Sequence, residues 1–143
     1  MKIAVVCANG KAGSLIVREA VERGLDVTAV VRSENQSATQ QVIQKDLFHL
    51  KASDLTGFDV VIDAFGTWTL ETLPQHSTSL NHLCNILSGQ DTRLLVVGGA
   101  GSLYVKPRAH RAGHGRGRFP GRIQAAGLSY GKKPWKIFGP ETM

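Results

Sequence analysis

Short apolar runs recur along the first two thirds of the chain, separated by longer stretches of mixed polarity. The runs at 2–8, 26–31, 58–64 and 93–97 are rich in Val, Ile, Leu and Ala. Continuous apolar runs of this length predict strands that are buried on both faces of a sheet. A weaker run at 41–44 predicts one further, short strand.

Two stretches between these strands have the spacing of amphipathic helices. The first, 14–23, has an apolar stripe that consists of Leu15, Ile16, Ala20 and Val21. The second, 70–87, has a stripe that consists of Leu73, Leu80, Leu83 and Leu87. Alternating strands and helices predict a doubly wound, parallel α/β sheet of the Rossmann-like type, with helices on both faces. Right-handed crossovers then predict the strand order 3-2-1-4-5.

The glycine turn between the first strand and the first helix is the first candidate for chemistry. In such a sheet this turn directs backbone N–H groups and a helix N-terminus at an anion, usually a pyrophosphate. The dinucleotide fingerprint is GxGxxG. The chain reads Cys-Ala-Asn-Gly-Lys-Ala-Gly at 7–13, with Gly10 and Gly13 in place and Cys7 where the first glycine belongs. A plain strand-to-helix turn without a ligand is the alternative.

Arg32 directly follows the second predicted strand. An acidic residue at this position binds the 2′-hydroxyl of a ribose, whereas an arginine accommodates a 2′-phosphate. Arg32 therefore favours NADP over NAD as the cofactor. A solvated arginine at the end of a strand is the alternative interpretation.

The ordered set of motifs resembles a known family. The stretch KIAVVCANGKAGSLIVREAVERGLDVTAVVR is similar to the N-terminus of atypical short-chain dehydrogenases of the NmrA-like group, which includes NADH-flavin reductases. QKDLF at 44–48, DVVIDAFG at 59–66, HSTSLNHL at 76–83 and RLLVVGGAGSL at 93–103 resemble its successive motifs. The resemblance covers residues 1–105 without a gap.

The resemblance implies a role for each matching segment. The glycine turn would line the pyrophosphate, Arg32 would hold the 2′-phosphate, and the segment at 46–47 would lie beside the adenine. The segment at 64–66 would flank the ribose and nicotinamide, and residues 98–102 would border the nicotinamide and the substrate. The implied cofactor-binding residues are Asn9, Gly10, Lys11, Ala12, Gly13, Arg32, Asp46, Leu47, Ala64, Phe65, Gly66 and Gly98.

The activity implied by the resemblance is hydride transfer from NAD(P)H, with NADPH preferred, to a flavin, a quinone or a similar acceptor. Ordinary short-chain dehydrogenases add a serine and a Tyr-x-x-x-Lys pair, and here Tyr104 is followed by Arg108 and Tyr130 by Pro134. Ser102 is the one candidate catalytic residue. The alternative is a non-enzymatic NAD(P)-sensing regulator, as some NmrA-like proteins are.

The positive charge of the chain is confined to its last segment. Residues 1–105 have a formal charge of −2, whereas residues 106–143 have a formal charge of +8 and contain 7 of the 16 glycines and 4 of the 5 prolines. Mixtures of arginine and glycine can bind RNA as disordered segments. We expect only weak, non-specific attachment to nucleic acid, because the aromatic residues of this segment form no regular platform.

A shift of reading frame explains the second segment better than a selected tail does. In the frame that joins the last two bases of each codon to the first base of the next, residues from 106 onward can encode NPEHTELVM and then ADFPDEFKPLALAMGKSL. The amino-acid sequence in that frame is acidic and has the apolar spacing of helices, and it resembles the family's continuation after Gly-Ser-Leu. We therefore expect a truncated Rossmann-like domain at 1–105 that keeps the cofactor crevice and loses the substrate side.

Cysteine content and hydropathy exclude several classes of protein. Cys7 and Cys84 make no disulfide framework and no metal cluster, and are interpreted as small buried residues. His49, His76 and His82 are dispersed and are interpreted as structural or surface residues. Without an apolar run long enough to cross a membrane and without a secretory cleavage signal, a cytoplasmic protein is the expectation.

Overall fold

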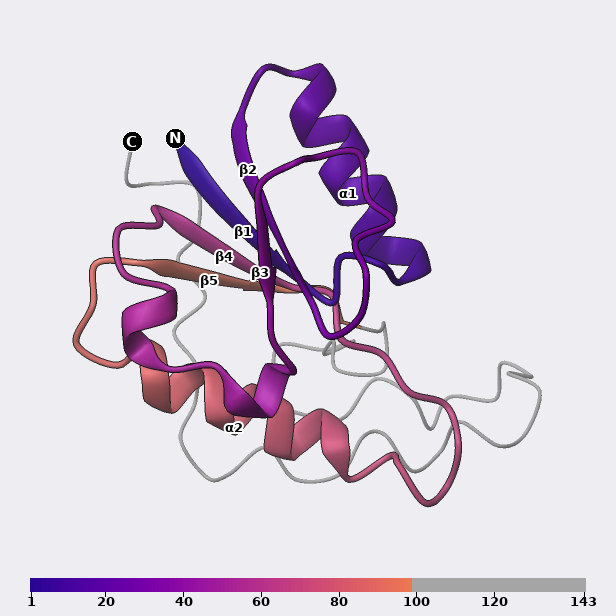
Figure 1. The fold of residues 1–143 in the computed structure, drawn as a ribbon. Helices are drawn as coiled ribbons and strands as arrows, with labels where there is room; N and C mark the ends of the chain where they lie inside the picture. Colours follow the sequence, from indigo (N-terminus) through magenta and orange to yellow (C-terminus); the bar gives the residue numbers. More distant parts are fainter. Residues whose placement is uncertain (99–143) are drawn as a thin grey trace, which may run out of the picture. The chain divides into compact units, whose positions relative to one another are not determined.

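The computed structural model describes residues 1–98. These residues form a five-stranded, fully parallel sheet in the order β3-β2-β1-β4-β5 (Figure 1). The strands are β1 (Lys2–Val6), β2 (Asp26–Val31), β3 (Val42–Gln44), β4 (Val60–Asp63) and β5 (Arg93–Val96). The predicted Rossmann-like fold and its strand order are confirmed. Ser102 and the segment 106–143 lie outside the described residues.

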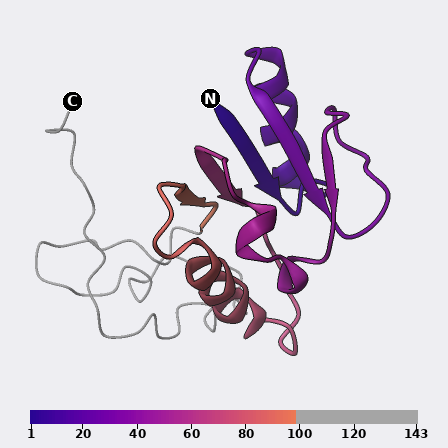
Figure 2. The same ribbon diagram turned by 60° about the vertical axis from the view of Figure 1, so that its left-hand side comes forward.

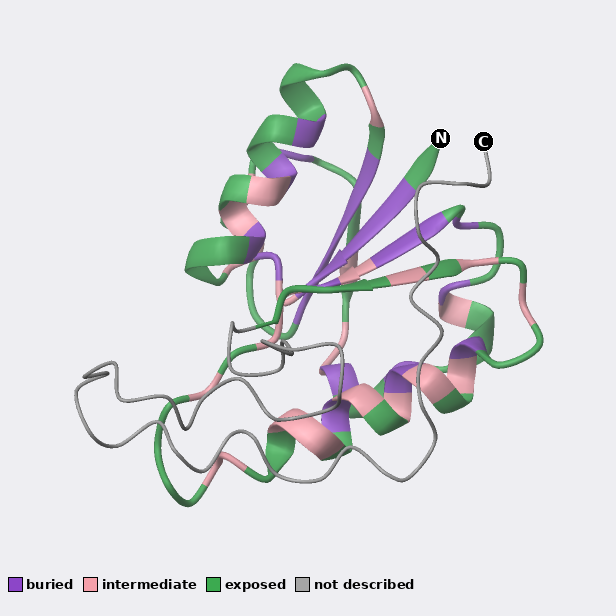
Figure 3. Cartoon of the chain, turned by 180° about the vertical axis from the view of Figure 1, so that it is seen from behind, coloured by how far each residue is buried: buried purple, intermediate pink, exposed green. Residues whose placement is uncertain are grey.

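Helices cover both faces of the sheet (Figures 1 and 2). On one face, α1 (Lys11–Glu22) packs Val17 and Ala20 against buried residues of β1 and β2. On the other face, α2 (Gln75–Leu87) packs Leu83 and Leu87 into a second core. Two short 3₁₀ helices, η1 (Leu47–His49) and η2 (Ala52–Asp54), complete that second layer. The strands β1, β2 and β4 are therefore buried between two layers, as Figure 3 shows.

The predicted stripe of the first helix is wrong in two of its four members. Helix α1 begins at Lys11 rather than at residue 14, and its buried residues are Gly13, Val17 and Ala20. Leu15 is 54 % exposed and Val21 is 38 % exposed. The prediction excluded the glycine turn from the helix because glycine is a poor helix former. Once Gly13 is included, the buried face follows the spacing i, i+4, i+7.

The second helix lies within the range that its apolar stripe predicts, and it begins directly after Pro74. Helix α2 starts at Gln75 because Pro74, which precedes it, lacks the backbone N–H that a helix interior needs. Leu73 therefore lies outside the helix, and Leu80 is half-buried rather than buried. The residues that are buried along α2 are Ser79, Leu83 and Leu87.

Strand β5 differs from the buried strand that its apolar sequence predicts. Within the described residues it pairs only with β4, in register from Val60 opposite Arg93 to Asp63 opposite Val96. Leu95 and Val96 are each 47 % exposed. This edge of the sheet is apolar and open, whereas the opposite edge strand, β3, is only three residues long. Among residues 1–98, no helix is long and apolar enough to cross a membrane.

Candidate functional site

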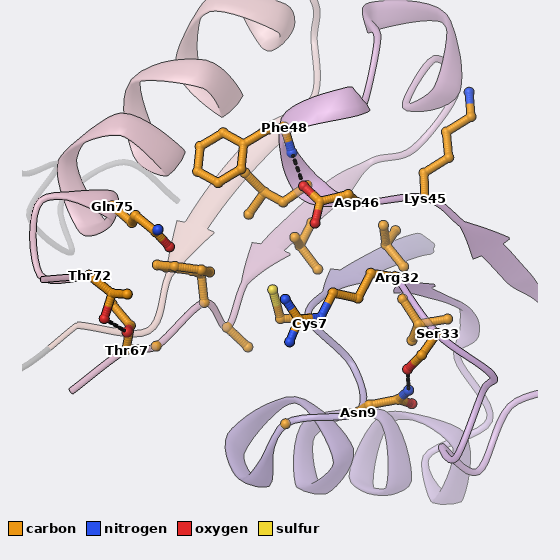
Figure 4. A pocket seen from close by; sticks show the side chains of 18 residues that line it. Cys7, Asn9, Arg32, Ser33, Lys45, Asp46, Phe48, Thr67, Thr72 and Gln75 are labelled. Atoms are coloured by element: carbon orange, nitrogen blue, oxygen red, sulfur yellow. Dashed lines mark hydrogen bonds between the residues drawn. The ribbon is translucent and has the colours of Figure 1, made fainter. Parts of the chain in front are cut away.

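A cavity of about 740 Å³ lies at the carboxyl ends of β1, β2, β3 and β4. This volume is ordinary for a small-molecule site. Figure 4 shows side chains from several loops directed toward one space. Eight of the twelve predicted cofactor-binding residues line it: Asn9, Gly10, Arg32, Asp46, Leu47, Ala64, Phe65 and Gly66.

The turn between β1 and α1 is held by close backbone contacts. Gly10 N donates a hydrogen bond to Cys7 O at 2.9 Å, and Cys7 has a left-handed backbone with φ of 60°. A Cβ on Gly13 would lie 2.4 Å from Cys7 O and 2.8 Å from the Cα of Ala8. Only glycine lets α1 approach the turn this closely, which is the role of the third glycine in the fingerprint. Cys7 adopts the conformation for which the first position usually has glycine.

The Cys7 side chain forms part of the cavity wall. The pKa of the Cys7 thiol is raised to about 11, mainly by burial and also by the carboxylates of Asp63 and Asp46, while Arg32 opposes the rise. Burial also raises the pKa of the Cys84 thiol. A thiol that stays protonated at neutral pH is a poor nucleophile. Cys7 therefore contributes to the shape of the cavity wall rather than to covalent chemistry.

Asn9 ties the turn to the loop that follows β2. Its Nδ2 donates a hydrogen bond to Glu34 O at 2.8 Å, and its Oδ1 accepts one from Gln36 N at 2.9 Å. Its Nδ2 also lies 3.4 Å from Ser33 Oγ. These contacts use the Asn9 side chain for structure and hold the segment with Arg32 and Ser33 beside the turn (Figure 4).

Two cationic side chains reach the same end of the cavity. Arg32 is exposed and forms no ion pair within residues 1–98, whereas Lys45 Nζ lies 2.6 Å from Asp54 Oδ1. The hydrogen bond from Lys45 is the main reason why the pKa of Asp54 is lowered. Arg32 is thus available for an anion, while Lys45 is already partly compensated.

The segment after β3 presents an aromatic ring that the sequence analysis missed. Asp46 Oδ1 accepts a hydrogen bond from Phe48 N at 2.9 Å and caps η1. Leu47 is 6 % exposed and belongs to the core, although it contributes to the cavity wall, whereas Phe48 is 40 % exposed. The motif Asp-Leu-Phe does not specify whether Phe48 faces the core or the cavity, because that depends on how η1 packs.

The segment after β4 forms the other end of the cavity. Ala64, Phe65 and Gly66 line it as predicted, and Thr67, Thr72 and Gln75 continue the wall. Nothing in the sequence identified Thr72 and Gln75, since the loop that precedes α2 carries no recognisable motif. This end has hydroxyl and amide groups where the Arg32 end has cations.

Buried groups behind this loop support it. Asp63 is buried, and its Oδ1 accepts a hydrogen bond from Phe65 N at 3.0 Å. Burial raises the pKa of Asp63, while that hydrogen bond and His76 oppose the rise. His76 Nε2 lies 2.9 Å from Thr67 O, and His82 Nε2 lies 3.0 Å from Leu50 O. Both histidines thus contact backbone, in accord with the structural role expected for them.

The remaining predicted residues do not line the cavity. Lys11 and Ala12 are exposed in the first turn of α1, Gly13 is buried beneath it, and Gly98 follows β5. Ser102, the candidate catalytic residue, lies outside the described part of the chain. Within residues 1–98 no group of three or more His, Cys, Asp or Glu side chains could hold a metal ion.

These features fit a nicotinamide dinucleotide. The turn places Gly10 at the N-terminus of α1, where unpaired backbone N–H groups favour a pyrophosphate. The close approach of Gly13 to the Cys7 carbonyl is what the dinucleotide fingerprint requires. The cavity extends from this turn to the carboxyl end of β4, across the point where the strand order reverses.

Comparisons with known proteins agree with this geometry. The protein YwnB of Bacillus subtilis is 45 % identical over 108 residues, which cover 73 % of this chain and 50 % of that protein. The crystal structure of SP1627 from Streptococcus pneumoniae, described as "a putative NADH-flavin reductase", matches with a TM-score of 0.74 and 57 % identity, over 78 % of this chain and 53 % of that one. The Lmo0794 protein from Listeria monocytogenes matches with a TM-score of 0.63 and 44 % identity, over 73 % of this chain and 63 % of that one.

The chain thus spans about half the length of the first relatives that it matches. The model of a family described as "NAD(P)H-binding" matches residues 7–120, from the cysteine of the glycine turn onward. Because that match covers well over half of the chain and the cavity has the corresponding geometry, this protein belongs to the NAD(P)H-binding family.

Proposed function

We propose that this protein binds NADP(H) in the cavity at the carboxyl ends of its strands and prefers it to NAD(H). The observation that carries the proposal is the placement of Arg32, which lines the cavity beside the glycine turn and has no ion-pair partner among residues 1–98. Asn9 supports the loop that follows Arg32. In this proposal the turn binds the pyrophosphate, and Arg32 binds the 2′-phosphate that distinguishes the two cofactors.

The test compares NADPH with NADH by calorimetry. One charge-assisted phosphate contact is expected to favour NADPH by ~1–2 kcal/mol. Arg32→Ala should remove that difference, whereas Arg18→Ala, which removes an exposed arginine of α1 outside the cavity wall, should preserve it. Equal affinities for the two cofactors, or an unchanged preference in Arg32→Ala, would show that Arg32 does not select the cofactor.

The reaction that we propose for this family member is hydride transfer to an oxidised flavin or a quinone-like acceptor. When bound, NADPH supplies a hydride, so that NADPH, oxidised flavin and one proton become NADP⁺ and reduced flavin. The residues of this chain bind and orient the reactants. The similarity to SP1627, whose name refers to NADH-flavin reductase, supports the flavin. Ser102 is proposed as the catalytic hydroxyl. In a version of the chain restored to the alternative reading frame, Ser102→Ala is expected to lower turnover without changing the affinity for NADPH.

A non-enzymatic NAD(P)-sensing regulator is the second candidate. It is favoured by the absence of a Tyr-x-x-x-Lys pair from the sequence. We propose that the chain lacks the substrate side and turns over slowly or not at all. Turnover of NADPH with FMN at an ordinary rate, with kcat ~10 s⁻¹, would contradict this. A version restored to the alternative frame that binds NADPH but reduces no acceptor would favour the regulator.

A further inference from the structure

The end of the cavity opposite Arg32 is lined by uncharged polar groups. Thr67 and Thr72 come from the loop between β4 and α2, and Gln75 is the first residue of α2. We call these three residues the hydroxyl–amide wall. Figure 4 shows them together on the side of the cavity away from Arg32 and Ser33, with the Thr67 and Thr72 hydroxyls directed at each other.

The backbone of this wall is held firmly. The Thr72 hydroxyl contacts the Thr67 hydroxyl, lies 2.5 Å from Thr69 Oγ1 and donates to Thr69 O at 3.2 Å. His76 Nε2 lies 2.9 Å from Thr67 O, which fixes the start of the loop against α2. Gln75 N donates a hydrogen bond to Thr72 O at 2.9 Å. A loop closed by its own hydroxyls and by a helix residue presents its outward groups in a defined arrangement.

The Gln75 side-chain amide is the group of this wall that remains available. Gln75 is exposed, lines the cavity, and its amide joins none of the hydrogen bonds formed within residues 1–98. A primary amide offers two donors and an acceptor with two lone pairs. It can therefore form a paired, two-bond contact with a ligand edge that has a carbonyl next to an N–H.

This pattern distinguishes between the acceptor classes that the proposed function allows. The pyrimidine part of a flavin has an imide edge, in which an N–H lies between two carbonyls. A quinone has carbonyls only, so it would satisfy the amide N–H and leave the amide oxygen without a donor. A ligand that lacks the N–H therefore forms one hydrogen bond fewer with the amide.

We propose that Gln75, on the scaffold of Thr67 and Thr72, binds the imide edge of a flavin acceptor, and that the hydroxyl–amide wall is the part of the acceptor subsite that precedes the proposed shift of reading frame. The inference rests on the proposed function, because an acceptor bound there must lie within reach of a nicotinamide held by the glycine turn. Phe65 and Gly66, which line the cavity next to the wall, supply the apolar surface that a flat ring system needs.

The test measures binding to the full chain rather than turnover. Lumiflavin and N3-methyllumiflavin, which lacks the imide N–H, are titrated by calorimetry in the presence of saturating NADP⁺. For the unaltered chain, methylation is expected to weaken binding about tenfold, the effect of one lost hydrogen bond. In Gln75→Leu both ligands should bind equally weakly, so that methylation costs nothing. Gln40→Leu, at an exposed glutamine outside the cavity wall, should behave as the unaltered chain does.

The possible failures are distinguishable. If the unaltered chain binds lumiflavin and N3-methyllumiflavin with equal affinity, the inference is overturned. That measurement needs no variant. A loss of NADPH affinity in Gln75→Leu equal to the loss of lumiflavin affinity would also overturn it, because Gln75 would then serve the cofactor's carboxamide. If NADPH binds but no flavin does, the inference fails and the cofactor proposal stands. If neither NADPH nor NADH binds to the unaltered chain, the proposed function itself fails.

Discussion

At the scale of single residues, Gly13 determines how closely the first helix can approach the cofactor turn. A methyl group at this position would overlap backbone atoms of Cys7 and Ala8, which cannot move without opening the turn. Gly13→Ala is expected to lower the free energy of unfolding by ~1–3 kcal/mol, the usual cost of overpacking. Urea unfolding followed by circular dichroism measures this.

Gly98→Ala is the matched control for this prediction. A Cβ at Gly98 meets no atom within 4 Å, and its φ is not in the left-handed region. Its effect should therefore remain within about 0.5 kcal/mol. Equal stability of Gly13→Ala and Gly98→Ala would show that the helix can shift away from the turn at little cost.

The thiol of Cys7 provides a prediction for pH. With a pKa of about 11, the thiolate is scarce at pH 8, and alkylation by iodoacetamide should be about two orders of magnitude slower than for a free cysteine. The rate should increase as the pH rises toward 11, because the thiolate fraction grows about tenfold for each pH unit below the pKa. Measurement in Cys84→Ser isolates Cys7, since the chain has two cysteines. A rate at pH 8 equal to that of free cysteine would mean that the site favours the thiolate.

At the scale of elements, the sequence predicted strands better than helix faces. Residues 26–31 form β2 with the predicted bounds, because a β-branched apolar run between a glycine and an arginine has few other structures open to it. Which residues of α1 are buried depends on whether Gly13 belongs to the helix. The close contact of Gly13 with the glycine turn decides this, rather than the helix propensity of glycine. Local periodicity contains no information about that contact.

The candidate site shows the same division. The glycine turn and Arg32 could be located because they adjoin strands and match a known fingerprint. Phe48 and Gln75 could not, because they reach the cavity through loops of η1 and α2 whose course depends on packing between distant segments. Asn9, predicted to bind the cofactor, lines the cavity, and its hydrogen bonds to the loop after β2 were not part of that prediction.

Strand β5 leads to a prediction about self-association. Leu95 and Val96 lie on a strand whose outer edge has no partner within the described residues, and each is 47 % exposed. Exposed apolar edge strands pair with other chains, and lysine is the usual protection. Leu95→Lys should therefore reduce concentration-dependent association in light scattering, with little change in stability. Leu15→Lys, at a comparably exposed leucine on α1, should not; an equal reduction in that variant would point to net charge as the cause.

At the scale of the whole molecule, the chain consists of two segments, 1–105 and 106–143, that differ in amino-acid composition. The first has a formal charge of −2 and contains the cavity residues that the structure describes, and the second has a formal charge of +8. We propose that residues 106–143 result from a shift of reading frame and that the substrate side has been lost with it. Sequencing the gene through the codons for residues 100–110 tests this. An unbroken frame that encodes the basic segment in the organism's own DNA and messenger RNA would favour a selected tail.

The division of the chain makes a final prediction about binding. Among residues 1–98, no residue beyond Gln75 lines the cavity, so a chain of residues 1–105 that folds, as judged by circular dichroism, is expected to bind NADPH with unchanged affinity. The nine Lys and Arg of the second segment can neutralise several phosphates, so the full chain should bind RNA at low salt and lose that affinity steeply as salt rises. Binding that persists at physiological salt and depends on RNA sequence would indicate a selected nucleic-acid element. Loss of NADPH binding in a folded, soluble 1–105 chain would show instead that the second segment completes the cofactor site.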